Sequence, residues 1–160
     1  MIRLPTTVLL CIVFTLSLNS VSGSKNKEEL CQDVCPPGWV SFANRCFQYI
    51  GIEKTWADAE MDCIELGGNL ASVHSEEEET FLLHLIVSKR ATSTWLGGSD
   101  GEQEGKWLWS DGSKWAFTKW NAWEPNNSGT ENCLLTYWDH GNWNDMNCNN
   151  QFAYICAINP

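Results

Sequence analysis

Alternation of hydrophobic and polar residues in the first half of the chain predicts a strand hairpin followed by a helix. Residues 39–42 and 45–50 alternate in the manner of two short strands joined by a tight turn. Thr55 is suited to cap a helix over residues 56–66, which places Ala59 and Cys63 on one face. The pair Gly67-Gly68 then predicts the end of that helix.

A second helix is predicted over residues 76–88. Ser75 followed by Glu78 has the spacing of a capping box at its start. The run of four glutamates at 76–79 falls in the first turn, where the helix dipole favours negative charge. We interpret this run as a solvated face of the helix and not as a metal site.

The pattern changes after Thr94 to short strand-like segments separated by long polar stretches. These segments are 95–98, 107–109, 133–137 and 152–156. Helices followed by a run of strands indicate an α+β domain. A loop of irregular structure over about 110–132 is long for a compact domain, so we expect it to be functional or held by a metal and disulfide bonds.

The first 23 residues have the pattern of a signal peptide. Arg3 precedes an apolar run over 8–18, and small residues suited to cleavage follow at 21–23. The apolar run is shorter than the ~18–20 residues that span a bilayer, although a signal anchor is the alternative. We expect a secreted, extracellular protein with a polar N-terminal extension over residues 24–34.

Charge and cysteine content narrow the class of protein further. Without residues 1–23 the chain keeps nine basic and 20 acidic side chains, a net charge of −11, which disfavours nucleic acid and anionic membranes as partners. Most of the ten tryptophans are expected in the core. Seven cysteines remain, an odd number, so a disulfide framework leaves one thiol over: Cys31, Cys35, Cys46, Cys63, Cys133, Cys148 and Cys156.

Oxygen-bearing side chains gather between residues 124 and 145. Three of the carboxylates and two of the amides in this span form the candidate set: Glu124, Glu131, Asp145, Asn126 and Asn144. Oxygen ligands in this number suit Ca²⁺, whereas zinc would need cysteine or histidine at suitable spacing. The alternative is a polar loop whose acids face water. The whole pattern favours a calcium site.

The chain from Cys35 to the C-terminus resembles a long-form C-type lectin domain. The matching segments are Cys35-Pro36-Pro37-Gly38-Trp39, Trp95-Leu96-Gly97-Gly98, Glu124-Pro125-Asn126, Trp143-Asn144-Asp145 and the final pair Cys148 and Cys156. Together with the short secreted form, they resemble the small soluble lectins of fish. The resemblance implies a C-type lectin domain over residues 35–160, with two helices, antiparallel sheets and long calcium-stabilised loops.

The resemblance also implies the disulfide pairing. It assigns the bonds Cys35–Cys46, Cys63–Cys156 and Cys133–Cys148 and leaves Cys31 without a partner in the chain. A free or capped Cys31 is one alternative. We favour an interchain bond that links two copies as a homodimer, because free thiols rarely persist in secreted proteins.

The family's principal calcium site maps onto the same five oxygen-bearing residues, and the resemblance assigns them to sugar binding as well. In the family, two sugar hydroxyls complete the calcium shell while they bond to the same side chains. Glu124-Pro125-Asn126, with a cis proline, is the pattern for mannose, N-acetylglucosamine or fucose, whereas galactose-type sites have Gln-Pro-Asp. The resemblance therefore implies binding of such glycans on microbial or cell surfaces, in innate defence.

Further site residues are expected from the same comparison. A second calcium site would use Asp100, Glu104, Asn127 and Asn132, although Asn132 stands where the family usually has an aspartate. Trp120 and Trp143 match core positions. Trp123 and His140, with Tyr137 and Trp138, are candidates for contact with the sugar.

Two other classes of function were weighed. Glu124 and Glu131 could form a glycosidase pair, but carboxylates that hold a cation stay ionised and supply no general acid. His74, His84 and His140 show no zinc or triad spacing. We therefore expect no enzyme activity. A galactose-binding lectin, or a protein of the same fold that binds ice or a protein ligand, is the alternative to a mannose-type lectin.

Overall fold

A computed structural model describes residues 35–137 and 142–159 of the chain. The predicted signal peptide, the extension with Cys31, and two candidate contacts, Trp138 and His140, lie outside the described residues. Within them, no helix is long and apolar enough to cross a membrane.

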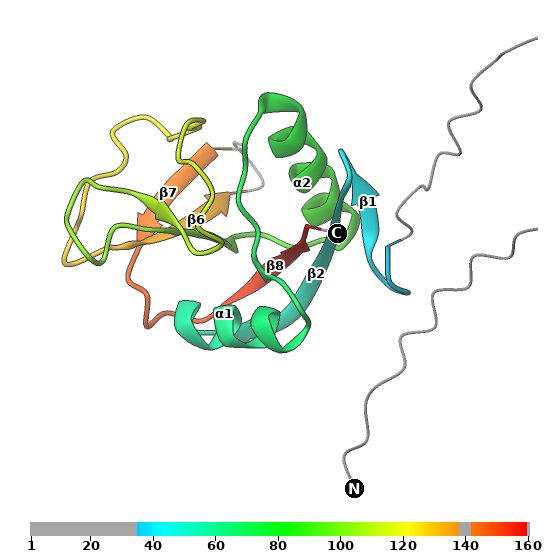
Figure 1. Ribbon diagram of the computed structural model, residues 1–160. Helices are drawn as coiled ribbons and strands as arrows, with labels where there is room; N and C mark the ends of the chain where they lie inside the picture. The colour runs from blue at the N-terminus through cyan, green and yellow to red at the C-terminus, as the bar shows by residue number, and fades with distance from the viewer. Residues whose placement is uncertain (1–34, 138–141, 160) are drawn as a thin grey trace, which may run out of the picture. The chain divides into compact units, whose positions relative to one another are not determined.

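One sheet organises the domain (Figure 1). Its strands follow the order β1 (Val40–Phe42), β2 (Arg45–Lys54), β8 (Phe152–Ile158), β4 (Thr94–Ser99), β6 (Cys133–Tyr137) and β7 (Asn142–Met146). Two short strands, β3 (Asn69–Leu70) and β5 (Leu108–Trp109), pair with β8 and β4. Neighbouring strands are antiparallel except β4 and β8, which are parallel. With two helices, this confirms the predicted α+β fold.

Local signals define the first helix, α1 (Trp56–Glu65), as expected. The Thr55 hydroxyl accepts from the Asp58 amide at 3.3 Å and satisfies one free N–H of the first turn. Leu66 is the C-cap, and Gly67 follows with φ +92°, a conformation that glycine adopts without steric cost. The helix therefore begins and ends within one residue of the predicted bounds.

The second helix, α2 (Glu76–Ser88), has the predicted bounds, but the interpretation of its glutamates was wrong for two of them. Ser75 accepts from the Glu78 amide at 3.2 Å, as a capping serine does. Glu78 does not face solvent: it is 4% exposed, pairs with Arg45 at 2.6 Å and accepts from the His74 amide at 2.8 Å. Glu79 is 1% exposed. Partners distant in sequence override the surface pattern of this run.

The two helices supply two different hydrophobic clusters because successive residues of β8 face opposite sides of the sheet. Ile155 lies in one cluster with Leu82 and Ile86 of α2. Tyr154 lies in the other cluster with Ala59 of α1. Both faces of the central strand are therefore covered.

Tryptophans fill the part of the core beneath the long loop. Five of them stack or meet edge to face, with ring centroids 4.4–6.3 Å apart: Trp107, Trp109, Trp115, Trp120 and Trp143. Gly98 of β4 makes room for this cluster, because a Cβ there would lie 2.9 Å from the Trp115 ring and from Leu134. Trp143 is a core residue, as expected, whereas Trp120 is partly buried and packs against the core.

Three disulfide bonds join the elements in the pairing that the resemblance implied: Cys35–Cys46, Cys63–Cys156 and Cys133–Cys148. They fasten the first hairpin, tie α1 to β8, and connect β6 to the segment after β7. The long stretch between β5 and β6 has no helix or strand, as predicted. Strands β3 and β7 were not predicted: β3 pairs with the distant β8, and β7, which forms a hairpin with β6, lacks a hydrophobic strand pattern.

Candidate functional site

The long loop between β5 and β6 is fastened to β7 through Trp143. Its backbone N–H donates to the Lys119 carbonyl at 2.7 Å, and its carbonyl accepts from the Asn121 amide at 2.8 Å. The indole is fully buried, so strand and loop share one fixed contact. This contact sets the position of the next residues on each side, Glu124 in the loop and Asn144 in the strand.

Asp145 of β7 joins the two halves of the predicted site. Its carboxylate is 1% exposed and accepts from the backbone amides of Asn126 and Asn127 at 3.0 and 2.6 Å. The bond between Glu124 and Pro125 is cis, as expected. The loop and the strand therefore meet at the residues that the sequence singled out.

The remaining predicted ligands lie around the same point. Glu124 accepts from the Asn126 side-chain amide at 2.5 Å, and Glu131 accepts from the Ser128 backbone N–H at 3.1 Å. Asn144 is 8% exposed, and its amide donates to the Asp145 carbonyl. All five residues are in one neighbourhood.

Like charges raise the affinity of these carboxyls for protons. Burial, followed by hydrogen bonding to Asp145 and its charge, raises the pKa of Glu124 above its ordinary value. Burial and the Asp145 charge likewise raise the pKa of Glu131. A divalent cation would stabilise the ionised form of these two carboxylates.

The donor set fits calcium in kind. Across residues 35–137 and 142–159, no group of three or more His, Cys, Asp and Glu side chains has the arrangement of a metal cluster. The predicted set has three carboxylates, whose oxygens accept hydrogen bonds from N–H groups of the loop. Its other two members are side-chain amides. Calcium is coordinated by the oxygens of both kinds of group. Hard oxygen donors in this number would hold Ca²⁺ and would not hold zinc.

The predicted second site has a different character. Asp100 is 1% exposed, and its two oxygens accept from the Asn132 side chain at 3.0 Å and the Gly105 amide at 2.8 Å. Glu104 accepts from the Asn127 side chain at 2.5 Å. The four residues do lie together, but protein donors already satisfy Asp100. The amide of Asn132 compensates the charge that a cation would otherwise neutralise.

Trp123 is the most exposed large hydrophobic residue of the described part, with 93% of its surface in solvent. It directly precedes Glu124 and therefore borders the predicted site. Tyr137 ends β6, but its side chain is outside the described part.

Asn147 was not predicted to contribute, yet it supports the loop. Its side-chain amide donates to the Thr130 carbonyl at 3.2 Å, and its oxygen accepts from the Asn149 amide at 3.0 Å. It thereby connects the segment after β7 to the residue before Glu131. The sequence feature that could have indicated this supporting role is the position of Asn147 directly before Cys148, within an asparagine-rich turn.

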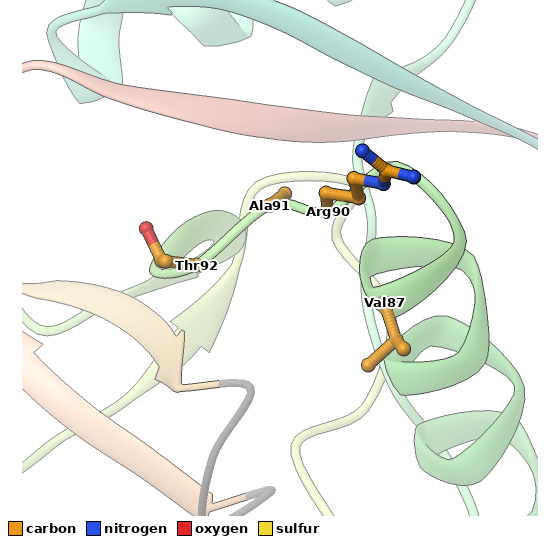
Figure 2. Close-up of a pocket in the computed structure, with 4 residues that line it drawn as sticks. All are labelled: Val87, Arg90, Ala91 and Thr92. Carbon is orange, nitrogen blue, oxygen red and sulfur yellow. The ribbon is translucent and has the colours of Figure 1, made fainter.

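A hollow elsewhere on the domain has unsuitable chemistry for a metal. Val87 and Arg90 at the end of α2, with Ala91 and Thr92 ahead of β4, line a space of about 290 Å³ (Figure 2). Among residues 35–137 and 142–159, its lining contains no carboxylate or side-chain amide. It does not compete with the loops as a calcium site.

Known proteins resemble the chain over most of its length. Residues 52–158 match the Lectin C-type domain. Ladderlectin from Oncorhynchus mykiss is 42% identical over 139 residues, which cover 81% of this chain and 73% of that protein. The galactose-specific lectin nattectin from Thalassophryne nattereri is 40% identical over 128 residues, covering 78% and 80%. The resemblance to fish lectins is confirmed.

Solved structures share the fold. The cow C-type carbohydrate-recognition domain of CD23, determined in the presence of a GlcNAc2Man3 oligosaccharide, superposes with a TM-score of 0.71 at 33% identity, covering 78% of this chain and 95% of that chain. A calcium-independent type II antifreeze protein superposes with a TM-score of 0.73 at 34% identity, covering 78% and 94%. C-type lectins bind carbohydrates and are not enzymes, which confirms that no catalytic role is to be expected. The chain belongs to the C-type lectin domain family.

Proposed function

We propose that the protein is a secreted, calcium-dependent lectin that binds mannose-type glycans on microbial or cell surfaces, in innate defence. The observation that carries the proposal is Asp145, a buried carboxylate that joins β7 to the Glu124–Asn127 segment. The net charge of −10 disfavours a nucleic acid partner. The family membership supports sugar as the ligand.

The residues of the site would share two tasks. Glu124, Asn126, Glu131, Asn144 and Asp145 would hold Ca²⁺, which would supply positive charge and coordination positions for two sugar hydroxyls. The carboxylates accept hydrogen bonds from the sugar hydroxyls, and the asparagine amides donate to the hydroxyl oxygens. This alternation of acceptors and donors sets which pair of hydroxyls the site prefers.

Galactose is the first alternative specificity, because nattectin, at 40% identity, is described as galactose-specific. Against it, Glu124 and Asn126 place a carboxylate before the proline and an amide after it, the order that the family uses for mannose-type sugars. The CD23 domain, whose structure was determined with a mannose-containing oligosaccharide, has the same fold.

Ice binding is the second alternative, since type II antifreeze proteins share the fold at 34% identity. The comparison protein is described as calcium-independent, whereas this chain carries all five oxygen-bearing ligands. A calcium-dependent type II antifreeze protein also shares the fold at 34% identity, so the calcium ligands favour a lectin only together with glycan binding, which the test below measures.

The test compares immobilised mannosides and galactosides, with calcium and with a chelator. We expect mannoside binding in calcium, loss in chelator, and loss in Glu131→Gln. The matched control is Glu65→Gln, which removes a carboxylate from the exposed end of α1 and should bind like the wild type. Equal binding in chelator would refute the calcium mechanism. Thermal hysteresis without glycan binding would favour the ice-binding alternative.

A further inference from the structure

Trp123 occupies a backbone position that a tryptophan does not favour. The Glu124 amide donates to the Asn121 carbonyl at 3.1 Å, which closes a four-residue turn with Trp123 third. The φ angle is +72° at Trp123 and is not positive at Ala122. Positive φ at the third position alone is the signature of a type II turn, where glycine or asparagine is normal.

The fold gains nothing visible from this side chain. A left-handed conformation is sterically unfavourable for a residue with a Cβ. The indole leaves 93% of its surface in water. It takes part in none of the ring contacts found among the described residues. The neighbouring Trp120, in contrast, meets two tryptophan rings edge to face and a third at a tilted angle. A strained, solvated aromatic residue beside a binding site is a reason to look for a ligand.

The turn fixes the place of the indole relative to the site. Asn121, its first residue, donates to the Trp143 carbonyl at 2.8 Å, and its side chain accepts from the Ala122 amide at 3.0 Å. Glu124, its last residue, is a proposed calcium ligand. The ring is therefore carried on a turn whose two ends are both held at the edge of the site.

We propose that Trp123 forms a second subsite, which stacks against the apolar C–H face of a sugar ring next to the one bound at the calcium ligands. This rests on the proposed function and specifies its ligand class: an oligosaccharide in preference to a monosaccharide. An aromatic ring gains binding free energy when a ligand covers its apolar face. A site that holds a single sugar ring leaves this free energy unused. A second sugar ring would cover the exposed indole of Trp123, and its binding free energy would offset the unfavourable backbone conformation.

The experiment measures affinity for a monosaccharide and for its disaccharide in calcium. The probes are methyl mannoside with mannobiose, and methyl galactoside with lactose. For the pair that the wild type binds, Trp123→Gly should lower the preference for the disaccharide about 3- to 10-fold, the range of a stacked ring pair. Monosaccharide affinity should fall by much less than disaccharide affinity. Trp123→Tyr keeps a ring and should keep most of the preference.

Stability separates this role from a structural one. Glycine relieves the left-handed strain, so Trp123→Gly should raise the Tm by about 3 °C while it weakens disaccharide binding. Ile52→Ala, which removes another exposed hydrophobic side chain, is the control and should change no preference. An unchanged disaccharide preference in Trp123→Gly, with monosaccharide binding intact, overturns the subsite alone. Failure of the wild type to bind any of the sugars overturns the proposed function and the subsite together.

Discussion

Replacing Glu79 by glutamine should stabilise the domain at neutral and alkaline pH. Glu79 is 1% exposed, and one of its oxygens accepts from the Trp143 indole at 3.0 Å while the other has no hydrogen-bond partner in the described structure. Burial, opposed by the Trp143 hydrogen bond and the Lys119 charge, raises the pKa of Glu79 from 4.5 to about 7. The nearby charge of Glu76 raises it further, and the Thr136 hydroxyl lowers it.

The direction of the pH effect follows from the raised pKa. Between pH 4.5 and about 7 the folded state holds a proton that the unfolded state has lost, so the wild-type free energy of unfolding falls as pH rises. The contribution is complete below pH 4.5 and is lost as pH passes about 7. At about 1.4 kcal/mol per pH unit, the shift corresponds to about 3 kcal/mol. A neutral glutamine of the same shape avoids this loss.

The measurement is urea unfolding of wild type and Glu79→Gln at several pH values, with tryptophan fluorescence as the signal. The variant should match the wild type near pH 4 and exceed it by about 3 kcal/mol at pH 8. All other carboxyls are present in both proteins, so the difference between the two curves reports on Glu79. Glu77→Gln, an exposed neighbour on α2, is the control and should show no such rise. A difference that does not depend on pH would refute the reasoning.

Three further predictions concern the site and the assembly. Glu124→Gln with Asn126→Asp exchanges an acceptor and a donor and should move the preference from mannosides toward galactosides, measured by competitive elution from both columns. Asn132→Asp places a second carboxylate beside Asp100 and removes the 3.0 Å bond between them, so the Tm should fall in chelator and recover with calcium; a Tm equal to that of the wild type in chelator would contradict this. Cys31→Ser should convert a disulfide-linked homodimer to a monomer on non-reducing gels, with sugar binding per site unchanged; a wild-type monomer would indicate a capped thiol.

Local chemistry explains why the helices could be predicted from sequence. Thr55 and Ser75 accept from amides three residues later, and Gly67 ends α1, so each signal and its partner lie within one turn. The core role of Trp143 was predictable from the family pattern. In the site, Asp145 and the Glu124–Asn127 segment were singled out before their contact was known.

Distant partners explain what the sequence did not reveal. Glu78 and Glu79 belong to a glutamate run that suits a solvated first turn, and their burial depends on Arg45 and Trp143, 33 and 64 residues away. Strand β7 has two polar ligand residues where a strand pattern would place hydrophobic ones. Its partner β6 is close in sequence, so the missing signal in this case was the hydrophobic pattern and not the distance.

The two ends of the lectin domain lie at the same edge of the sheet. Cys35 is bonded to Cys46 of β2, and Cys46 is paired with Ile158 of β8. The strand order puts β1 and β2 at one margin and β7, with Asp145, at the other (Figure 1). A surface, tag or second domain attached at either end of the domain would therefore leave the opposite margin of the sheet unobstructed. The domain can thus be immobilised by its ends as a sensor, with the loops near Asp145 facing the sample.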